Sequence, residues 1–295
     1  MPYLIRYVVF VLVLSFGACA YGQNQNSACP LLAKTAAMDG GVISYLEGGK
    51  GERILLLHGL FAQKEQWLEV GCALAISGFD VIAPDLPGYG ASSTFPVSVY
   101  PLERQVKILH QLVTSLGSGA IHIAGSSMGG AIASLYVDQY PKEIKSLAFI
   151  GAPLGIVGWS PQVKASIFQG VNPFIPVSNE QLNLEMSLLF FKPPVIDEAV
   201  KSQLVKEYVL NNRHYQQVWD IVNFYGACLD RKQNNSVKTL ILWGKQDGIF
   251  DIAGLPLLKE RFPQAQSYAF SDAAHLLMLE QPKQVVDVYR RFIRP

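Results

Sequence analysis

Two adjacent serines, Ser126 and Ser127, lie between an apolar run and a helix-like segment. Only Ser127 has glycine both two residues before it (Gly125) and two residues after it (Gly129), as the pattern G-x-S-x-G requires. A nucleophile on a sharp strand-to-helix turn has a strained backbone, and we expect the glycines to relieve crowding around its Cβ. An ordinary Gly/Ser turn is the alternative, but the predicted strand before the pattern and helix after it favour a catalytic serine. Ser127 is therefore the candidate nucleophile.

A serine hydroxyl needs a general base that takes its proton, and the sequence offers five histidines. One of them, His275, lies in a loop between a short strand-like run and the C-terminal helical segment. From such a loop a side chain can reach the carboxyl edge of a parallel sheet, where ligands bind. We predict that His275 is the base. The other histidines are expected in structural or surface positions: His58, His110, His122 and His214.

The base in turn needs a carboxylate that holds its tautomer and stabilises the imidazolium. Asp247 lies in a glycine-bounded loop directly after an apolar run, which places it at the same predicted edge. Asp251 is a close second candidate, and Asp272 lies three residues from His275. A turn-forming aspartate before glycine is the alternative role for Asp247. We predict that Asp247 is the acid of a Ser–Asp–His triad.

The oxyanion that forms during acyl transfer needs hydrogen-bond donors. The backbone N–H of Met128, directly after the serine, is one predicted donor. The second is expected in the loop after the apolar run that ends at His58. We predict the N–H of Leu60, with that of Phe61 as the alternative.

The arrangement of apolar runs predicts the fold. Runs of apolar residues alternate with helical periodicity, such as the stripe from Leu102 to Leu116 and the segment from Ala131 to Pro141. Buried strands separated by helices indicate an α/β fold with a mostly parallel sheet covered on both faces. The predicted strands are 53–59, 79–85, 120–125, 144–153 and 237–244.

One region, residues 154–236, lacks a convincing buried strand and carries several prolines and helical patterns. We predict a helical cap here, inserted into a core formed by residues 36–153 and 237–295. Its strongly apolar stretch 186–194 packs the cap onto the core, lines a substrate pocket, or does both. The predicted pocket residues are Phe61, Leu189 and Phe190.

The N-terminal residues 1–20 combine Arg6, an apolar stretch and the ending Ala18-Cys19-Ala20, which is typical of a secretory signal peptide. Lipidation at Cys19 and an uncleaved membrane anchor are the alternatives. Residues 21–35 are predicted to be a polar tether. We expect an exported protein, periplasmic or secreted, or one anchored to the membrane through this segment.

Composition excludes some partners. The net charge is +1, and removal of Arg6 with the leader would leave 23 basic and 23 acidic residues, so nothing indicates nucleic-acid binding. The sequence has neither a glycine-rich nucleotide loop nor a His/Cys/carboxylate cluster with metal-ligand spacing, and we predict no cofactor and no metal. After cleavage, Cys29, Cys72 and Cys228 would allow at most one disulfide, and we expect free buried thiols at Cys72 and Cys228.

Five stretches carry a resemblance to a known family: "HGLFAQKEQW", "DVIAPDLPGYGASS", "GSSMGG", "WGKQDGIFD" and "AAHLLMLEQP". They resemble, in order and over roughly residues 40–295, the successive blocks of the α/β-hydrolase superfamily. The similarity is greatest to its lipase/esterase branch, which includes bacterial secreted lipases and monoacylglycerol lipases. The resemblance implies a triad of Ser127, Asp247 and His275 and a cap at 154–236. Many relatives have histidine where this chain has Ser126.

The resemblance and the candidate residues together indicate a serine carboxylester hydrolase that acts on lipophilic esters or acylglycerols. Access to substrate at a membrane surface is compatible with this prediction. Serine at the elbow argues against epoxide hydrolases and haloalkane dehalogenases, which use aspartate there. Other hydrolases of the same fold stay open: carbon–carbon bond hydrolases, thioesterases and haloperoxidase-like enzymes. A non-catalytic ligand-binding protein is a further alternative.

Overall fold

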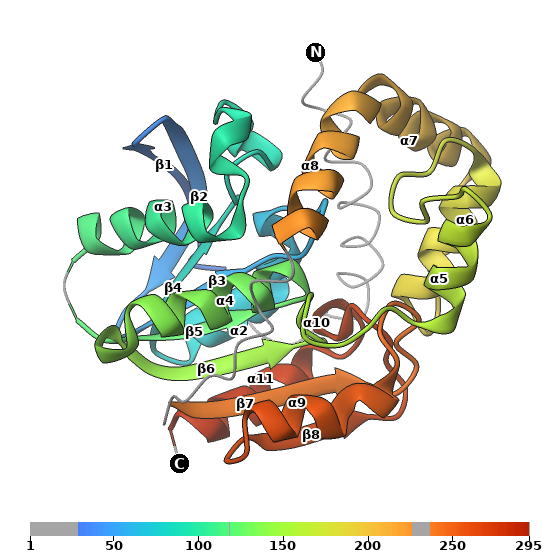
Figure 1. Ribbon diagram of the computed structural model, residues 1–295. Coiled ribbons are helices and arrows are strands. Elements are labelled where there is room, and N and C mark those ends of the chain that lie inside the picture. Colours follow the sequence, from blue (N-terminus) through green and yellow to red (C-terminus); the bar gives the residue numbers. More distant parts are fainter. Residues whose placement is uncertain (1–28, 118, 226–236, 295) are drawn as a thin grey trace.

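The computed structural model describes residues 29–117, 119–225 and 237–294, and it contains an eight-stranded sheet (Figure 1). The strand order is β1-β2-β4-β3-β5-β6-β7-β8. The β1–β2 and β2–β4 pairs are antiparallel, and every other neighbouring pair is parallel. The prediction of an α/β fold with a mostly parallel sheet is confirmed. The strands are β1 (Leu32–Met38), β2 (Gly41–Gly49), β3 (Glu52–Leu57), β4 (Phe79–Pro84), β5 (Ile121–Gly125), β6 (Ile144–Ile150), β7 (Lys238–Gly244) and β8 (Gln266–Phe270).

The five predicted strands correspond to β3 through β7, and these carry most of the buried apolar side chains of the sheet. Strands β1 and β2, which form a hairpin at one edge, were not predicted from the sequence. β1 is largely exposed, so its sequence lacks the apolar run that marks a buried strand. Because β1 begins at Leu32, the last four residues of the predicted tether 21–35 belong to the sheet.

Helices cover both faces of the sheet (Figure 1). On one face, the predicted stripe of α3 is buried from Leu102 to Val113, and α4 ends at Gln139, before Pro141. A proline cannot continue a helix, which explains that end. The helices on this face are α3 (Leu102–Ser115), α4 (Met128–Gln139) and α9 (Leu255–Arg261). Those on the other face are α2 (Leu68–Ile76), α10 (Leu277–Glu280) and α11 (Pro282–Ile293).

Among the described residues between β6 and β7, four further helices form an arch beside the sheet (Figure 1). They are α5 (Pro161–Phe168), α6 (Asn179–Leu189), α7 (Glu198–Leu210) and α8 (Asn212–Tyr225), all within the residues for which a helical insertion was predicted. The side chains of Ser160, Ser178 and Asp197 accept hydrogen bonds from backbone N–H groups at the starts of α5, α6 and α7. Such caps satisfy donors that a helix leaves unpaired.

A disulfide joins Cys29 to Cys72, with 5.1 Å between the Cα atoms. The prediction of a free thiol at Cys72 was therefore wrong, whereas Cys228 lies outside the described residues. The chain before β1 runs beside α2, where Leu31 packs in the same apolar cluster as the helix. The two cysteines are 43 residues apart in the sequence and come together only through this tertiary packing. The sequence therefore did not reveal the disulfide.

The predicted signal peptide, residues 1–20, also lies outside the described residues. Within the part of the chain that the structure describes, no helix has the length and apolar character needed to span a membrane.

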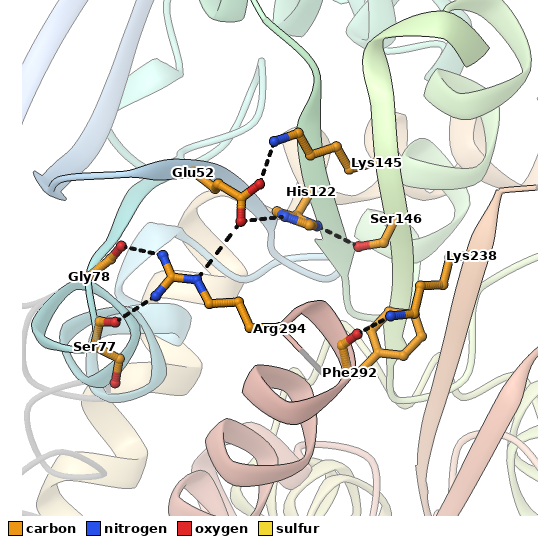
Figure 2. A network of polar contacts seen from close by, with 9 residues as sticks. All are labelled: Glu52, Ser77, Gly78, His122, Lys145, Ser146, Lys238, Phe292 and Arg294. Atoms are coloured by element: carbon orange, nitrogen blue, oxygen red, sulfur yellow. Dashed lines mark hydrogen bonds and ion pairs between the residues drawn. The ribbon is translucent and has the colours of Figure 1, made fainter.

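A polar network ties the amino ends of the parallel strands to the C-terminus (Figure 2). Glu52 at the start of β3 accepts a hydrogen bond from Lys145 (2.5 Å) and lies 3.8 Å from both His122 and Arg294. His122 is also hydrogen-bonded through Nδ1 to Ser146 Oγ at 2.8 Å. His122 thus lies at the opposite end of β5 from Ser127, in the structural position expected for it.

Candidate active site

The serine elbow lies between β5 and α4. Ser127 has φ 53° and ψ −116°, a conformation that residues other than glycine rarely adopt. A Cβ added at Gly125 would lie 2.2 Å from the backbone of Gly129, and one added at Gly129 would lie 2.2 Å from the carbonyl oxygen of Leu57. The glycines are therefore needed because backbone segments approach closely. This corrects the expectation that crowding around the Ser127 Cβ was the cause.

A buried carboxylate lies against His275. His275 Nδ1 is 2.9 Å from Asp247 Oδ2, and the indole N–H of Trp243 donates to the same oxygen at 2.9 Å. The other oxygen, Oδ1, accepts hydrogen bonds from the backbone N–H groups of Ile249 (2.8 Å) and Phe250 (3.1 Å). These four contacts fix the carboxylate and the imidazole ring. With Nδ1 facing Asp247, Nε2 is the nitrogen left to exchange a proton.

The other two candidate carboxylates have different roles. Asp251 Oδ1 accepts from the N–H of Ala253 at 2.9 Å and so caps a short 3₁₀ helix. Asp272 is exposed, and its carbonyl oxygen accepts a hydrogen bond from Gln281. Among the described residues, no group of three or more His, Cys, Asp or Glu side chains could hold a metal ion.

Ser127 and His275 line one cavity, which opens between the sheet edge and the cap. All three predicted pocket residues, Phe61, Leu189 and Phe190, line it too, although no observation tests whether they bind substrate. Two aromatic residues that the sequence analysis missed, Trp159 and Phe174, also line it, with their ring centres 5.4 Å apart. Most of the lining is apolar, as an acyl chain requires.

The two predicted oxyanion donors are the backbone N–H groups of Met128 and Leu60. Met128 is the first residue of α4, so its N–H has no acceptor one turn earlier in the helix. Leu60 lies in the loop after β3 and lines the same cavity. In that loop, Gly59 donates to Gln66 Oε1 (3.0 Å) and Phe61 has φ 58°. The roles of Leu60 and Met128 stay predictions that this loop geometry supports.

The side chain of His58 stabilises the loop after β3, which carries Gly59, Leu60 and Phe61. Its Nδ1 lies 2.8 Å from the carbonyl oxygen of Gly59, and its Nε2 accepts a hydrogen bond from the N–H of Leu86 at 2.9 Å. Both contacts are satisfied only by the neutral imidazole, with the proton on Nδ1. The side chain is fully buried, and this burial lowers the pKa of His58 to about 4.

The pKa of His58 predicts acid destabilisation. The unfolded chain binds the proton below pH 6.5, whereas the folded protein binds it only near pH 4, so stability is lost as the pH falls through this range. The shift corresponds to a loss of about 3 kcal/mol in the free energy of unfolding. Urea unfolding at pH 7 and pH 4 measures it. A His58→Asn variant is expected to lose less than the wild type over that range. Equal losses in the two proteins would contradict the assignment.

The cap is hydrogen-bonded to both loops of the Asp–His pair. At the end of α6, the carbonyl oxygen of Leu188 accepts from Gly248 N–H at 3.1 Å. The carbonyl oxygen of Leu189 accepts from the N–H groups of His275 (3.1 Å) and Leu276 (3.2 Å). The helix that lines the cavity is therefore also part of the support of His275.

Glu280 on α10 strengthens this link. Its Oε2 accepts from the N–H of Ala274 at 2.7 Å, and its Oε1 accepts from the N–H of Phe191 at 2.8 Å and that of Lys192 at 3.3 Å. One carboxyl group thus joins the His275 loop to the segment after α6. Glu280 was not predicted from the sequence, because nothing in its spacing marks the contact.

The serine elbow, Asp247 and His275 follow β5, β7 and β8, whose parallel pairing brings their carboxyl ends to one edge of the sheet. This arrangement defines a hydrolase of the α/β class. The family model for the alpha/beta hydrolase fold matches residues 52–282, and the chain belongs to this family.

Individual relatives are similar over most of the chain. Lipase 1 of Psychrobacter immobilis is 31% identical over 92% of this chain and 86% of that lipase. A monoacylglycerol lipase of Xenopus laevis is 28% identical over 83% of this chain and 76% of its own length. The solved structure of a bacterial membrane phospholipase A superposes with a TM-score of 0.82 at 26% identity, covering 97% of this chain and 92% of that one.

Proposed function

We propose that the protein is a serine carboxylester hydrolase of the lipase/esterase type, which cleaves acyl esters of lipids such as acylglycerols. One observation carries the proposal: the hydrogen-bonded Asp247–His275 pair shares an apolar cavity with Ser127, which lies on a strained elbow. The lipases and the monoacylglycerol lipase among its relatives support the same substrate class.

The proposed reaction has two stages. Ser127 Oγ attacks the ester carbonyl carbon while His275 Nε2 takes its proton, and the N–H groups of Leu60 and Met128 stabilise the oxyanion. When the intermediate collapses, His275 returns the proton to the leaving alcohol and the acyl group stays on Ser127. Water then attacks the acyl-enzyme with His275 again as base, which releases the fatty acid and restores the serine. Asp247 stabilises the imidazolium in both stages.

We further infer export. A disulfide between Cys29 and Cys72 is typical of an oxidising compartment, which supports the predicted signal peptide and a periplasmic or secreted location. An anchored form with access to lipid at a membrane surface is the alternative, and N-terminal sequencing of the mature protein separates the two.

A fluorophosphonate probe and a series of p-nitrophenyl esters test the proposed activity. We expect the folded protein to be labelled at one serine and heat-denatured protein to stay unlabelled. The rate should rise with acyl length, because longer chains bury more apolar surface in the cavity. A folded protein that neither reacts with the probe nor cleaves any ester of the series would contradict the proposal.

A further inference from the structure

Glu185 is an acidic side chain in the lining of the cavity that holds Ser127 and His275. It lies on α6 and is only 5% exposed. Its Oε1 accepts a hydrogen bond from the hydroxyl of Tyr208 on α7 at 3.3 Å, and its Oε2 is buried with no partner among the described residues. A buried polar atom without a partner is costly, and such an atom in a substrate cavity points to a partner that arrives with the substrate.

The surroundings of Glu185 determine which partner fits. Burial raises the pKa of Glu185 to about 8, and the hydrogen bond from Tyr208 opposes this rise only in part. At neutral pH the side chain is therefore mainly the carboxylic acid, which presents a hydroxyl donor rather than a negative charge. Among the described residues that line the cavity there is no lysine or arginine, so nothing there would neutralise a phosphate or a carboxylate. The fitting partner is an uncharged oxygen with a free lone pair.

We propose that Glu185 is a specificity-determining residue, which donates a hydrogen bond from Oε2 to an uncharged hydroxyl or carbonyl oxygen of the substrate, away from the scissile ester. The inference rests on the proposed esterase function. It predicts that esters carrying such an oxygen are preferred over simple alkyl esters of the same acid, because an ester without it leaves the donor unpaired. The oxygen belongs either to the alcohol portion, as in a partly acylated glycerol, or to a hydroxylated acyl chain.

Tyr208 is a positioning residue in this proposal. Its hydroxyl occupies Oε1, which leaves Oε2 as the oxygen that carries the proton toward the substrate. Its ring centre lies 5.1 Å from that of Tyr215 on α8, so two cap helices hold the carboxyl group from one side.

Ratios of kcat/KM test the proposal. The first ratio compares monooleoylglycerol with methyl oleate, and the second compares methyl ricinoleate, a hydroxylated chain, with methyl oleate. In Glu185→Leu we expect at least one ratio to fall about tenfold, as loss of one buried hydrogen bond implies. Glu185→Gln keeps an N–H donor and should retain most of that preference. Glu180→Gln, an exposed glutamate of the same helix, is the matched control. If Glu185→Leu leaves both ratios at the wild-type value, the proposal is wrong.

The pH dependence of a kcat/KM ratio in the wild type is a second test. It does not require the Glu185→Leu variant to fold. The titratable groups that face Glu185 are Tyr208 on α7, Tyr215 behind it on α8, and His275 across the cavity. His275 acts on both substrates in the same way, so its contribution cancels in the ratio, and burial raises the pKa of Tyr208 well above its usual value. A substrate hydroxyl could still donate to the ionised carboxylate, so the test uses a carbonyl oxygen, which can only accept, and compares kcat/KM for methyl 12-oxostearate with that for methyl stearate. This wild-type ratio should fall as the pH rises above about 8, when Glu185 ionises, and should stay constant in Glu185→Gln. A wild-type ratio that is flat through this range would overturn the proposal.

Different results would contradict the proposed esterase function and the proposed role of Glu185. A wild-type protein that cleaves none of these esters contradicts the proposed function itself. A wild-type protein that cleaves them with ratios insensitive to Glu185 contradicts only the role of Glu185. Fluorophosphonate labelling of each variant shows whether its Ser127 site is intact.

Discussion

Replacing Ser127 by alanine is expected to lower kcat for an acyl ester by a factor of about 10⁶, the loss typical of removing a catalytic serine. Ser127 is the residue at the turn with φ 53° directly before α4, and it lines the same cavity as His275. Spectrophotometric turnover of a p-nitrophenyl ester measures the effect. The variant should also lose all labelling by a fluorophosphonate.

Ser126 offers a matched control one residue away. Its hydroxyl is buried without a hydrogen-bond partner among the described residues, although the residue lines the same cavity. Removing that oxygen breaks no hydrogen bond, and we expect Ser126→Ala to keep more than a tenth of the wild-type kcat. Both variants should unfold within a few degrees of the wild type. If Ser126→Ala were the inactive variant and Ser127→Ala the active one, the assignment of the nucleophile would be reversed.

The parts of the fold that were predictable from the sequence are those with strong local signals. Strands β3 to β7 are buried on both faces, so they read as short apolar runs, and α3 shows a clear helical stripe. The β1–β2 hairpin lies at an edge with one exposed strand, and its alternating pattern is weak. The Cys29–Cys72 bond depends on the path of the chain before β1, which no local pattern encodes.

The same distinction between local sequence signals and tertiary contacts applies to the candidate site. Ser127 was predicted from its flanking glycines, and Asp247 and His275 were predicted from their loops after strand-like runs. The residues that support them carry no local signal. Trp243 holds Asp247 from within β7, and Glu280 joins the His275 loop to the cap, and both contacts exist only in the folded chain. Glu185 was missed for the same reason, because its unpaired oxygen is a property of the cavity.

The cap has two connected functions in this arrangement. The end of α6 accepts hydrogen bonds from the Asp247 and His275 loops, and the middle of the same helix places Glu185 in the cavity. A change in the position of α6 would therefore alter both substrate contacts and the support of the base.

Asp247→Asn is expected to lower kcat by about 10⁴ while leaving the fold intact, because it reverses the tautomer of His275. Asp247 accepts all four of its hydrogen bonds: His275 and Trp243 donate to Oδ2, and the N–H groups of Ile249 and Phe250 donate to Oδ1. An asparagine of the same shape has one oxygen and one NH₂ group. With its oxygen kept on the two backbone donors, the NH₂ group faces His275 Nδ1, which must then accept a hydrogen bond. The imidazole proton moves to Nε2, and the base can no longer take the proton of Ser127.

Asp251→Asn is the matched control for this variant, since it makes the same chemical change four residues along the chain. Asp251 caps a short 3₁₀ helix and is not hydrogen-bonded to His275, so we expect its kcat to stay within a factor of about two of the wild type, as for a surface cap. Burst kinetics with a p-nitrophenyl ester separates acylation from deacylation, and both steps should slow in Asp247→Asn because His275 serves both. Loss of activity in Asp251→Asn with retention in Asp247→Asn would assign the acid to the other carboxylate. A slowed deacylation alone would show that His275 keeps its tautomer during the attack of Ser127, and that Asp247 acts later in the cycle than the geometry indicates.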